Sequence, residues 1–275
     1  MGKLTAEQEY LAKHYGATIF QFETDRLEKY CPVEFAITCR YLERHVPSNA
    51  VVADVGVGVG HYSLLLAQKG CSVHLVDISV ELLQAARERL EHSGLGGRVE
   101  AVHRASATEL GCLESGSLDA LLMLGPFYHL REPDERRRAV KEARRVLKSS
   151  GVLFAAAVNR MSYLGALFHE MPEEVVGRKG FHESFLNDGK LDPEHAPPIG
   201  YAHLITVSEF RKLFQGAFEE LALVGTESFT TAWQSKLTDL SPATREAWLD
   251  LVEETGRTPE GLGQSDHFLF IGRRL

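Results

Sequence analysis

The sequence has little of several features that mark particular classes of protein. It has four cysteines and no Cys-x-x-Cys pair, which argues against a disulfide framework or a cysteine-ligated zinc site. Its apolar runs, such as VLFAAAV at 152–158, are too short to cross a bilayer. Its 30 Lys and Arg residues are outnumbered by 38 Asp and Glu, a formal net charge of −8. That balance gives no electrostatic reason to bind nucleic acid.

The first residues lack the apolar stretch of a secretory signal, because Lys3, Glu7, Glu9 and Lys13 interrupt it. The 275 residues are 44% apolar and 25% charged, which is typical of a globular protein. We therefore expect a cytoplasmic protein without a membrane partner or a nucleic-acid partner. The sequence does not indicate its oligomeric state.

What the sequence does contain is an alternation of strands and helices from residue 51 onward. Short apolar runs predict strands at 51–55, 71–77, 98–103, 118–124 and 151–158. Amphipathic patterns predict helices between them, with Ser79 as one N-cap and Pro133 opening another helix. This order predicts an α/β fold, a doubly wound and mostly parallel sheet with helices on both faces.

The alternation stops at residue 159. Residues 159–205 continue with a helical pattern and then a loop rich in Gly, Pro, Asp and His. After them we expect a helix capped by Ser208, a sixth strand at 218–228, a helix near 242–255 and a seventh strand at 265–274. The predicted organisation is an N-terminal helical cap over 1–47 and a cofactor-binding domain over 48–275. Within that domain, we expect the insertion at 159–205 to cover an acceptor site.

The glycine-rich stretch VVADVGVGVGHYS, residues 51–63, follows the first strand and suggests a ligand site. In an open parallel sheet, ligands bind beyond the carboxyl ends of the strands. Glycine lets the backbone approach a ligand closely, and the next helix presents free N–H groups. A dinucleotide fingerprint needs a sixth-position glycine where this chain has His61. The spacing fits Gly-x-Gly-x-Gly over Gly56, Gly58 and Gly60, with Asp54 two residues earlier.

Asp77, at the end of the second predicted strand, is the next candidate ligand-binding residue. A carboxylate at this place accepts hydrogen bonds from the hydroxyls of a ribose. NAD and S-adenosylmethionine both carry that ribose, so Asp77 indicates an adenosine ligand without choosing between them. The alternative is an acid that only caps the turn before Ser79.

The order of these motifs resembles that of the class I S-adenosylmethionine-dependent methyltransferases. The resemblance rests on VVADVGVGVGHYS, HLVDIS, SGSLDALLMLGPFYHL and EARRVLKSSGVLF, within residues 45–160. The tail, ending HFLFIGRR, is also similar to that seven-stranded fold, whose last strand is antiparallel. The GPFYHL element and the insertion are most similar to the bacterial small-molecule branch near the ubiquinone-biosynthesis methyltransferases.

The resemblance implies a set of cofactor contacts. It places Gly56, Gly58 and Gly60 under the methionine end of S-adenosylmethionine, with Asp54 beside the ammonium group. It places Asp77 at the ribose. The other implied contacts are Ile78 next to Asp77, Ser106 and Ala107 where the family has an adenine-binding acid, and Leu124 and Gly125 after the fourth strand.

LGPFYHL, residues 124–130, leaves the fourth strand where a methyl acceptor would lie. His129 is the candidate general base, because imidazole titrates near neutral pH. A structural His129 that bonds a backbone carbonyl is the alternative, and both stay open. Tyr128 would orient the acceptor or contact the sulfonium, unless it only packs. Gly125 lacks the side chain that nucleobase- and glutamine-methylating enzymes use to accept from their amines, which disfavours those targets.

The histidines of the insertion fit no metal-ligand spacing, so no metal is expected. The sequence predicts methyl transfer from S-adenosylmethionine to a small-molecule acceptor. One alternative is a cofactor-binding protein of the same fold without turnover. A second is an NAD(P)-dependent oxidoreductase. RNA methylation ranks last, because the acidic charge and Gly125 both disfavour it.

Overall fold

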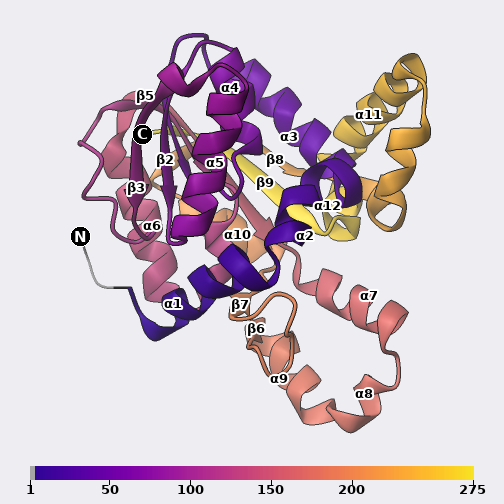
Figure 1. Ribbon diagram of the computed structural model, residues 1–275. Coiled ribbons are helices and arrows are strands. Elements are labelled where there is room, and N and C mark those ends of the chain that lie inside the picture. The colour runs from indigo at the N-terminus through magenta and orange to yellow at the C-terminus, as the bar shows by residue number, and fades with distance from the viewer. Residues whose placement is uncertain (1–3) are drawn as a thin grey trace.

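The computed structural model describes residues 4–275 and shows a seven-stranded sheet with helices on both faces (Figure 1). The strand order is β3-β2-β1-β4-β5-β9-β8. The strands from β1 to β5 pair in parallel, and β9 runs antiparallel to both β5 and β8. The doubly wound sheet and the antiparallel last strand are therefore confirmed.

The strands lie close to their predicted positions. They are β1 (Val51–Val55), β2 (Ser72–Asp77), β3 (Val99–Arg104), β4 (Leu118–Met123), β5 (Leu147–Val158), β8 (Phe218–Gly225) and β9 (His267–Arg274). The helices between the parallel strands are α4 (His61–Gln68), α5 (Val80–His92) and α6 (Pro133–Val146), with short 3-10 turns η3 (Gly96–Arg98) and η4 (Pro126–His129). The start of β5 at Leu147 is earlier than the predicted 151, because the strand extends along β4 from Leu118.

Helix caps fit the sequence at one predicted position and not at another. The Ser79 hydroxyl accepts from the Leu82 N–H and begins α5, as predicted. The predicted Ser208 cap is wrong, because the N-cap of α10 (Val207–Phe214) is Thr206, two residues earlier. There the Thr206 hydroxyl accepts from the Glu209 N–H, and the Glu209 carboxylate accepts from the Thr206 N–H. This reciprocal pair is a capping box.

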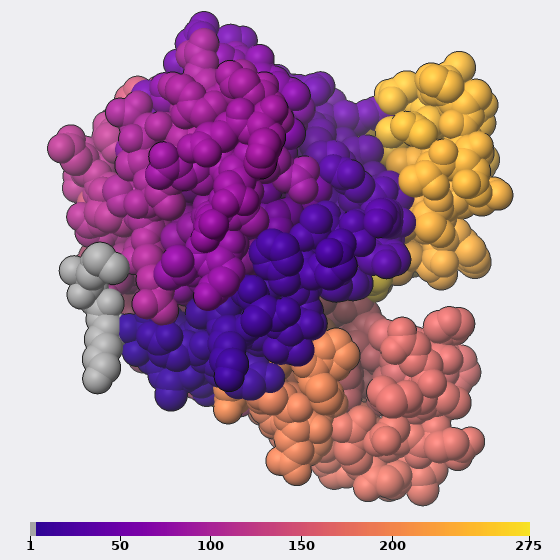
Figure 2. Space-filling model, viewed as in Figure 1, coloured from indigo at the N-terminus to yellow at the C-terminus, as the bar shows by residue number. Residues whose placement is uncertain are grey.

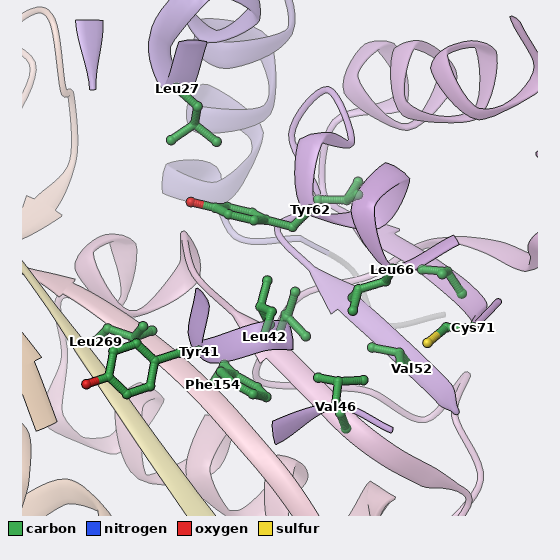
Figure 3. Close-up of a cluster of buried hydrophobic side chains, with 14 of the residues drawn as sticks. Leu27, Tyr41, Leu42, Val46, Val52, Tyr62, Leu66, Cys71, Phe154 and Leu269 are labelled. Atoms are coloured by element: carbon green, nitrogen blue, oxygen red, sulfur yellow. The ribbon is translucent and has the colours of Figure 1, made fainter. Parts of the chain in front are cut away.

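Successive residues of each strand point to opposite faces of the sheet and build two apolar layers. Val52 of β1 packs on one face with Leu42 of α3 (Pro32–His45) and Leu66 of α4 (Figure 3). Ala53 and Val55 pack on the other face, against α6 and α10. Because β1 to β5 pair in parallel, their carboxyl ends lie at a common edge of the sheet.

The chain before β1 is helical over most of its length. It comprises α1 (Ala6–Lys13), the π-helical turn η1 (His14–Thr18), α2 (Phe20–Asp25), a second π-helical turn η2 (Arg26–Tyr30) and α3. We call residues 4–30 the N-terminal segment. In Figure 2 its atoms lie across the front of the molecule, between the first half of the sheet domain and the insertion. Residues 1–3, the start of the predicted cap, lie outside the described residues.

The predicted insertion is more regular than its sequence indicates. It holds α7 (Arg160–Glu170), α8 (Glu174–Gly177), α9 (Lys179–Asp188) and a two-stranded sheet of β6 (Lys190–Leu191) and β7 (Ala202–His203). α9 falls in the predicted loop, where Phe185 is buried in a separate small core. In Figure 1, α7 to α9 arch away from the main sheet.

Beyond β8 the chain forms η5 (Ser228–Asp239), α11 (Pro242–Gly256) and α12 (Pro259–Gln264). α11 covers the helix expected near 242–255. Within residues 4–275, no helix is long and apolar enough to span a bilayer.

Candidate functional site

A cavity lies at the carboxyl ends of β1, β2 and β4, where the strand order reverses. This is the position at which open α/β sheets bind ligands. Among the sequence-predicted cofactor residues, those that line it are Gly56, Gly58, Asp77, Ile78, Ser106, Ala107 and Gly125. The two predicted catalytic residues, Tyr128 and His129, line it as well.

Asp77 is held at the end of β2 by backbone donors on both sides. Its carboxylate accepts from the Gly58 N–H at 3.2 Å and from the Ser79 N–H at 2.9 Å. Burial raises the pKa of Asp77 to about 6, although these N–H groups oppose the shift. The carboxylate thus joins the glycine turn to β2 and presents its remaining acceptor capacity to the cavity.

The three glycines of the turn have different surroundings. Gly56 and Gly58 have φ of 75° and 56°, a left-handed backbone that favours glycine. A Cβ on Gly58 would meet nothing within 4 Å, whereas one on Gly56 would meet Pro126 at 2.9 Å. A Cβ on Gly60 would lie 3.0 Å from the Cα and Cβ of Ala86. Gly60 therefore lets α5 pack closely on the turn and does not line the cavity.

Two more predicted cofactor residues also lie outside the cavity wall. Asp54 is 2% exposed, and its carboxylate accepts from the Ser63 hydroxyl at 2.7 Å. Burial raises the pKa of Asp54 to about 7, with the Ser63 bond opposing. Leu124 packs against the apolar layer of α3 and α4. In this conformation, both side chains support the wall from behind.

Ser106 occupies the place that the sequence assigns to an adenine contact. Its hydroxyl accepts from the Gln8 side-chain N–H at 3.0 Å and lies 2.9 Å from the Thr108 hydroxyl. Gln8 belongs to α1, so the N-terminal segment touches the adenine end of the predicted site directly.

His129 has a protein partner on each ring nitrogen. Its Nδ1 lies 2.8 Å from the Tyr201 carbonyl, and its Nε2 lies 3.0 Å from the Tyr15 hydroxyl. A carbonyl only accepts, so Nδ1 carries the proton and Nε2 accepts from the Tyr15 O–H. Burial lowers the pKa of His129 to about 4. The imidazole is therefore neutral near pH 7, and the lone pair on Nε2 already accepts the hydrogen bond from Tyr15.

The opposite wall of the cavity comes from the N-terminal segment. Its lining residues are Gln8, Leu11, Ala12, Tyr15 and Glu23. None of these was a predicted site residue. The one signal in the sequence was the aromatic content of residues 1–47, which does not single out any position.

The insertion reaches the site through one backbone group and one apolar contact. The Tyr201 carbonyl holds His129, and Tyr128 packs against the insertion's small core. Among the described residues, none from 159–205 lines the cavity itself. That the insertion covers an acceptor therefore stays a prediction.

A buried polar cluster lies beside this wall, in a place that the sequence does not indicate. Ligand atoms of Glu34, Glu227 and His267 lie within 4.8 Å of one another, a geometry that could hold a metal ion. Burial disfavours the charged form of His267, but Glu34 and Glu227 outweigh it and raise its pKa to about 9. Arg26 Nη1 also donates to Glu34 at 2.8 Å. Internal cations therefore neutralise these carboxylates, and the arrangement is that of an ion-pair network.

Comparison with known proteins finds a family that is similar to the central part of the chain. Residues 52–151 match the family described as "Methyltransferase domain". A ubiquinone biosynthesis O-methyltransferase of Xanthomonas axonopodis is 33% identical over 151 residues, which are 53% of this chain and 60% of that protein. The ribosomal RNA small subunit methyltransferase C of Alcanivorax borkumensis is 33% identical over 115 residues, or 41% of this chain and 34% of that protein. The chain thus spans 60% or less of the length of both relatives.

A solved structure confirms the fold over nearly the full length of the chain. Geranyl diphosphate C-methyltransferase from Streptomyces coelicolor, in complex with Mg²⁺, geranyl diphosphate and S-adenosyl-L-homocysteine, superimposes with a TM-score of 0.60. The match covers 99% of this chain and 100% of that one at 13% sequence identity. At this identity, the likeness speaks for the architecture alone.

Proposed function

The chain carries a domain of the class I S-adenosylmethionine-dependent methyltransferases, and on this premise we propose that it transfers a methyl group to a small-molecule acceptor. The single observation that carries the proposal is the junction of Asp77 with a turn that has Gly-x-Gly-x-Gly spacing and not the spacing of a dinucleotide fingerprint. The Asp77 carboxylate faces the cavity at the strand-order reversal and is bonded to Gly58 of the glycine turn.

The residues present fit the adenosine half of such a cofactor. Asp77 would accept from the ribose hydroxyls, while Ile78, Ser106 and Ala107 would surround the base. Gly56 and Gly125 leave the methionine half without side-chain obstruction. When bound, S-adenosylmethionine supplies a methyl group on a positively charged sulfur.

This chain's own residues would position the acceptor. Tyr128 and His129 lie on the wall that follows β4, and Tyr15 faces them from the N-terminal segment. Holding two reactants in line lowers the barrier through orientation alone. The apolar side chains of Leu11, Leu82 and Leu130 help to exclude water from the same space.

Calorimetry tests the cofactor directly. We expect S-adenosylmethionine and S-adenosylhomocysteine to bind and NADH not to bind. Asp77→Ala should weaken binding by about 1–3 kcal/mol, the scale of hydrogen bonds to a charged group. Asp134→Ala, an exposed carboxylate on α6, is the matched control with unchanged affinity. Binding of NADH in place of S-adenosylmethionine would support the oxidoreductase alternative instead.

The ribosomal RNA relative makes RNA the second candidate acceptor. Against it stand the net charge of −8 and the absence of Lys and Arg from the cavity lining within residues 4–275. The protein is incubated with methyl-labelled cofactor and either ribosomal RNA or a panel of small molecules. The acceptor that takes up the label distinguishes the two acceptor classes. Cofactor binding without transfer to either class would favour the non-catalytic alternative.

The two flanking segments have distinct proposed roles. The N-terminal segment would close the cofactor site, because Gln8 and Tyr15 bond to Ser106 and His129 across the cavity. The insertion would cover the acceptor, as its sequence position predicts. Binding of cofactor and acceptor should then slow protease cleavage of the insertion within residues 177–200. Equal cutting rates with and without ligands would limit the lid to the N-terminal segment.

A further inference from the structure

Glu23 places a carboxylate in the cavity wall, and the roles assigned so far do not use it. It lies on α2, and its side chain is 17% exposed. Arg26 Nε is 3.7 Å from the Glu23 carboxylate, beyond hydrogen-bond distance. The Arg26 guanidinium instead donates a short hydrogen bond, 2.8 Å, to the Glu34 carboxylate. Glu23 therefore keeps acceptor capacity for a ligand.

The general base that the sequence predicts, His129, already has a hydrogen-bond partner on each ring nitrogen. His129 donates through Nδ1 to the Tyr201 carbonyl and accepts through Nε2 from Tyr15. Taking a proton from an acceptor would require His129 to release the Tyr15 hydroxyl. Burial also lowers its pKa, which makes it a weak base.

The pKa of Glu23 is shifted in the opposite direction to that of His129. Burial raises its pKa, and Arg26 opposes that shift. A carboxylate with a raised pKa is better matched to proton uptake near neutral pH. The titratable and charged groups that act on Glu23 or respond to it come from several elements. They are Tyr15, Arg26, Glu34, Asp77, Tyr128 and His267.

The charge of the cavity restricts what it can take. Among the described lining residues, Glu23 and Asp77 carry carboxylates, and no Lys or Arg contributes a side chain. An anionic acceptor such as a phosphate ester would find no cationic side chain in this lining to balance its charge. A neutral or cationic molecule with an ionisable N–H or O–H suits this wall.

We propose that Glu23 binds the methyl acceptor and removes its proton, and that the acceptor is an amine or another neutral or cationic proton donor. This inference rests on the proposed function. In the reaction, the acceptor N or O forms a bond to the methyl carbon as the carbon–sulfur bond breaks. The bond's electron pair stays on sulfur, the acceptor proton moves to the Glu23 carboxylate, and neutral S-adenosylhomocysteine remains.

Two cofactor analogues test the position of Glu23 without knowledge of the acceptor. Sinefungin carries a protonated amine where S-adenosylmethionine carries its methyl group, and S-adenosylhomocysteine carries nothing there. We expect Glu23→Gln to weaken sinefungin about tenfold or more, the scale of a bond to a charged group, and to leave S-adenosylhomocysteine unchanged. Asp25→Asn, a carboxylate on the same helix that pairs with Lys29, is the control and should change neither affinity.

The outcomes separate this inference from the function on which it rests. If neither analogue binds the wild-type protein, the methyltransferase proposal fails. If both bind and Glu23→Gln weakens both equally, Glu23 serves the amino-acid end that the analogues share, and the base role is overturned. If Glu23→Gln changes neither, Glu23 does not face the methyl position, and the inference is again overturned.

The wild-type protein gives a second test through its pH dependence. The ratio of sinefungin affinity to S-adenosylhomocysteine affinity should fall as Glu23 becomes protonated at low pH. Asp77 titrates in the same range, so the ratio measured for Glu23→Gln is the control, and it should stay constant with pH. A wild-type ratio that stays constant from pH 8 to pH 4 overturns the inference. Methyl transfer to simple phosphate esters but not to amines or phenols would overturn the acceptor class.

Discussion

The Tyr15 hydroxyl lies 3.0 Å from His129 Nε2, and their rings meet edge to face at a centroid distance of 5.1 Å. The two residues are 114 positions apart in the chain. Their bond joins the N-terminal segment to the loop after β4, and the Tyr201 carbonyl joins the same imidazole to the insertion. One neutral histidine thus connects three parts of the protein at the edge of the cavity.

Tyr15→Phe should lower the free energy of unfolding by about 1–3 kcal/mol, because His129 Nε2 would lose its partner. Urea unfolding monitored by circular dichroism measures the change. Tyr10→Phe is the matched control: it removes a hydroxyl from α1 for which no side-chain hydrogen bond is found within residues 4–275. Equal losses in the two variants would contradict the importance of the Tyr15–His129 bond.

His129 and His267 should show opposite protonation states in one nuclear magnetic resonance experiment. With pKa values of about 4 and about 9, His129 is neutral and His267 is protonated at pH 7. The ¹⁵N shifts of His129 should indicate the Nδ1–H form down to about pH 5. The His129→Gln and His267→Gln variants assign the two signals. A His129 signal that titrates near its ordinary value would refute the assignment.

Asp54 should make the protein less stable as the pH rises. The folded state keeps the Asp54 proton up to about pH 7, whereas the unfolded chain releases it near pH 4. Between these values the unfolded state binds fewer protons, so the free energy of unfolding falls with pH. Relative to Asp54→Asn, the wild type should lose at most about 1.4 kcal/mol per pH unit in this window.

Asp119→Asn is the control for that comparison. Burial of Asp119 is outweighed by Lys148 and the Val51 N–H, which lower its pKa. Its contribution to stability is therefore lost only below about pH 4. Urea titrations at several pH values from 4.5 to 7.5 should show a constant offset for Asp119→Asn. A constant offset for Asp54→Asn as well would show that Asp54 ionises normally.

Gly60→Ala should destabilise the fold more than Gly58→Ala. Both glycines have positive φ, which costs an alanine about 1–2 kcal/mol. Only at Gly60 would the new methyl group also press on Ala86 of α5. Thermal unfolding of the two variants measures the difference. If Gly58→Ala were the more damaging change, the turn would be packed differently from the structure.

The residues near the strand ends were predictable because sequence-local rules govern them. A strand, a glycine turn and a helix follow one another within residues 51–68, and this order alone places Gly56 and Gly58 at the sheet edge. Asp77 ends β2 by the same logic. Gly60 fits the motif equally well in sequence, yet its place against Ala86 depends on how α5 packs, which the motif does not encode.

The rest of the site depends on contacts between distant segments. The sequence around Tyr15 and Glu23 does not indicate that α1 and α2 cross the carboxyl ends of the strands. Arg136 illustrates the same limit. The arginine run at 136–138, on α6, is typical of a solvated helix face, but Arg136 is only 7% exposed and its guanidinium donates to the Arg131 carbonyl. A charged residue that caps a loop cannot be told from a surface one by spacing.

The placement of β9 has a consequence for how the protein is made. β9 follows β8 in sequence but lies between β5 and β8 in the sheet. As the chain leaves the ribosome, β8 therefore has no partner strand until β9 emerges, and β5 keeps one open edge. The first five strands can assemble during synthesis, whereas β8 joins the sheet only after β9 has been translated.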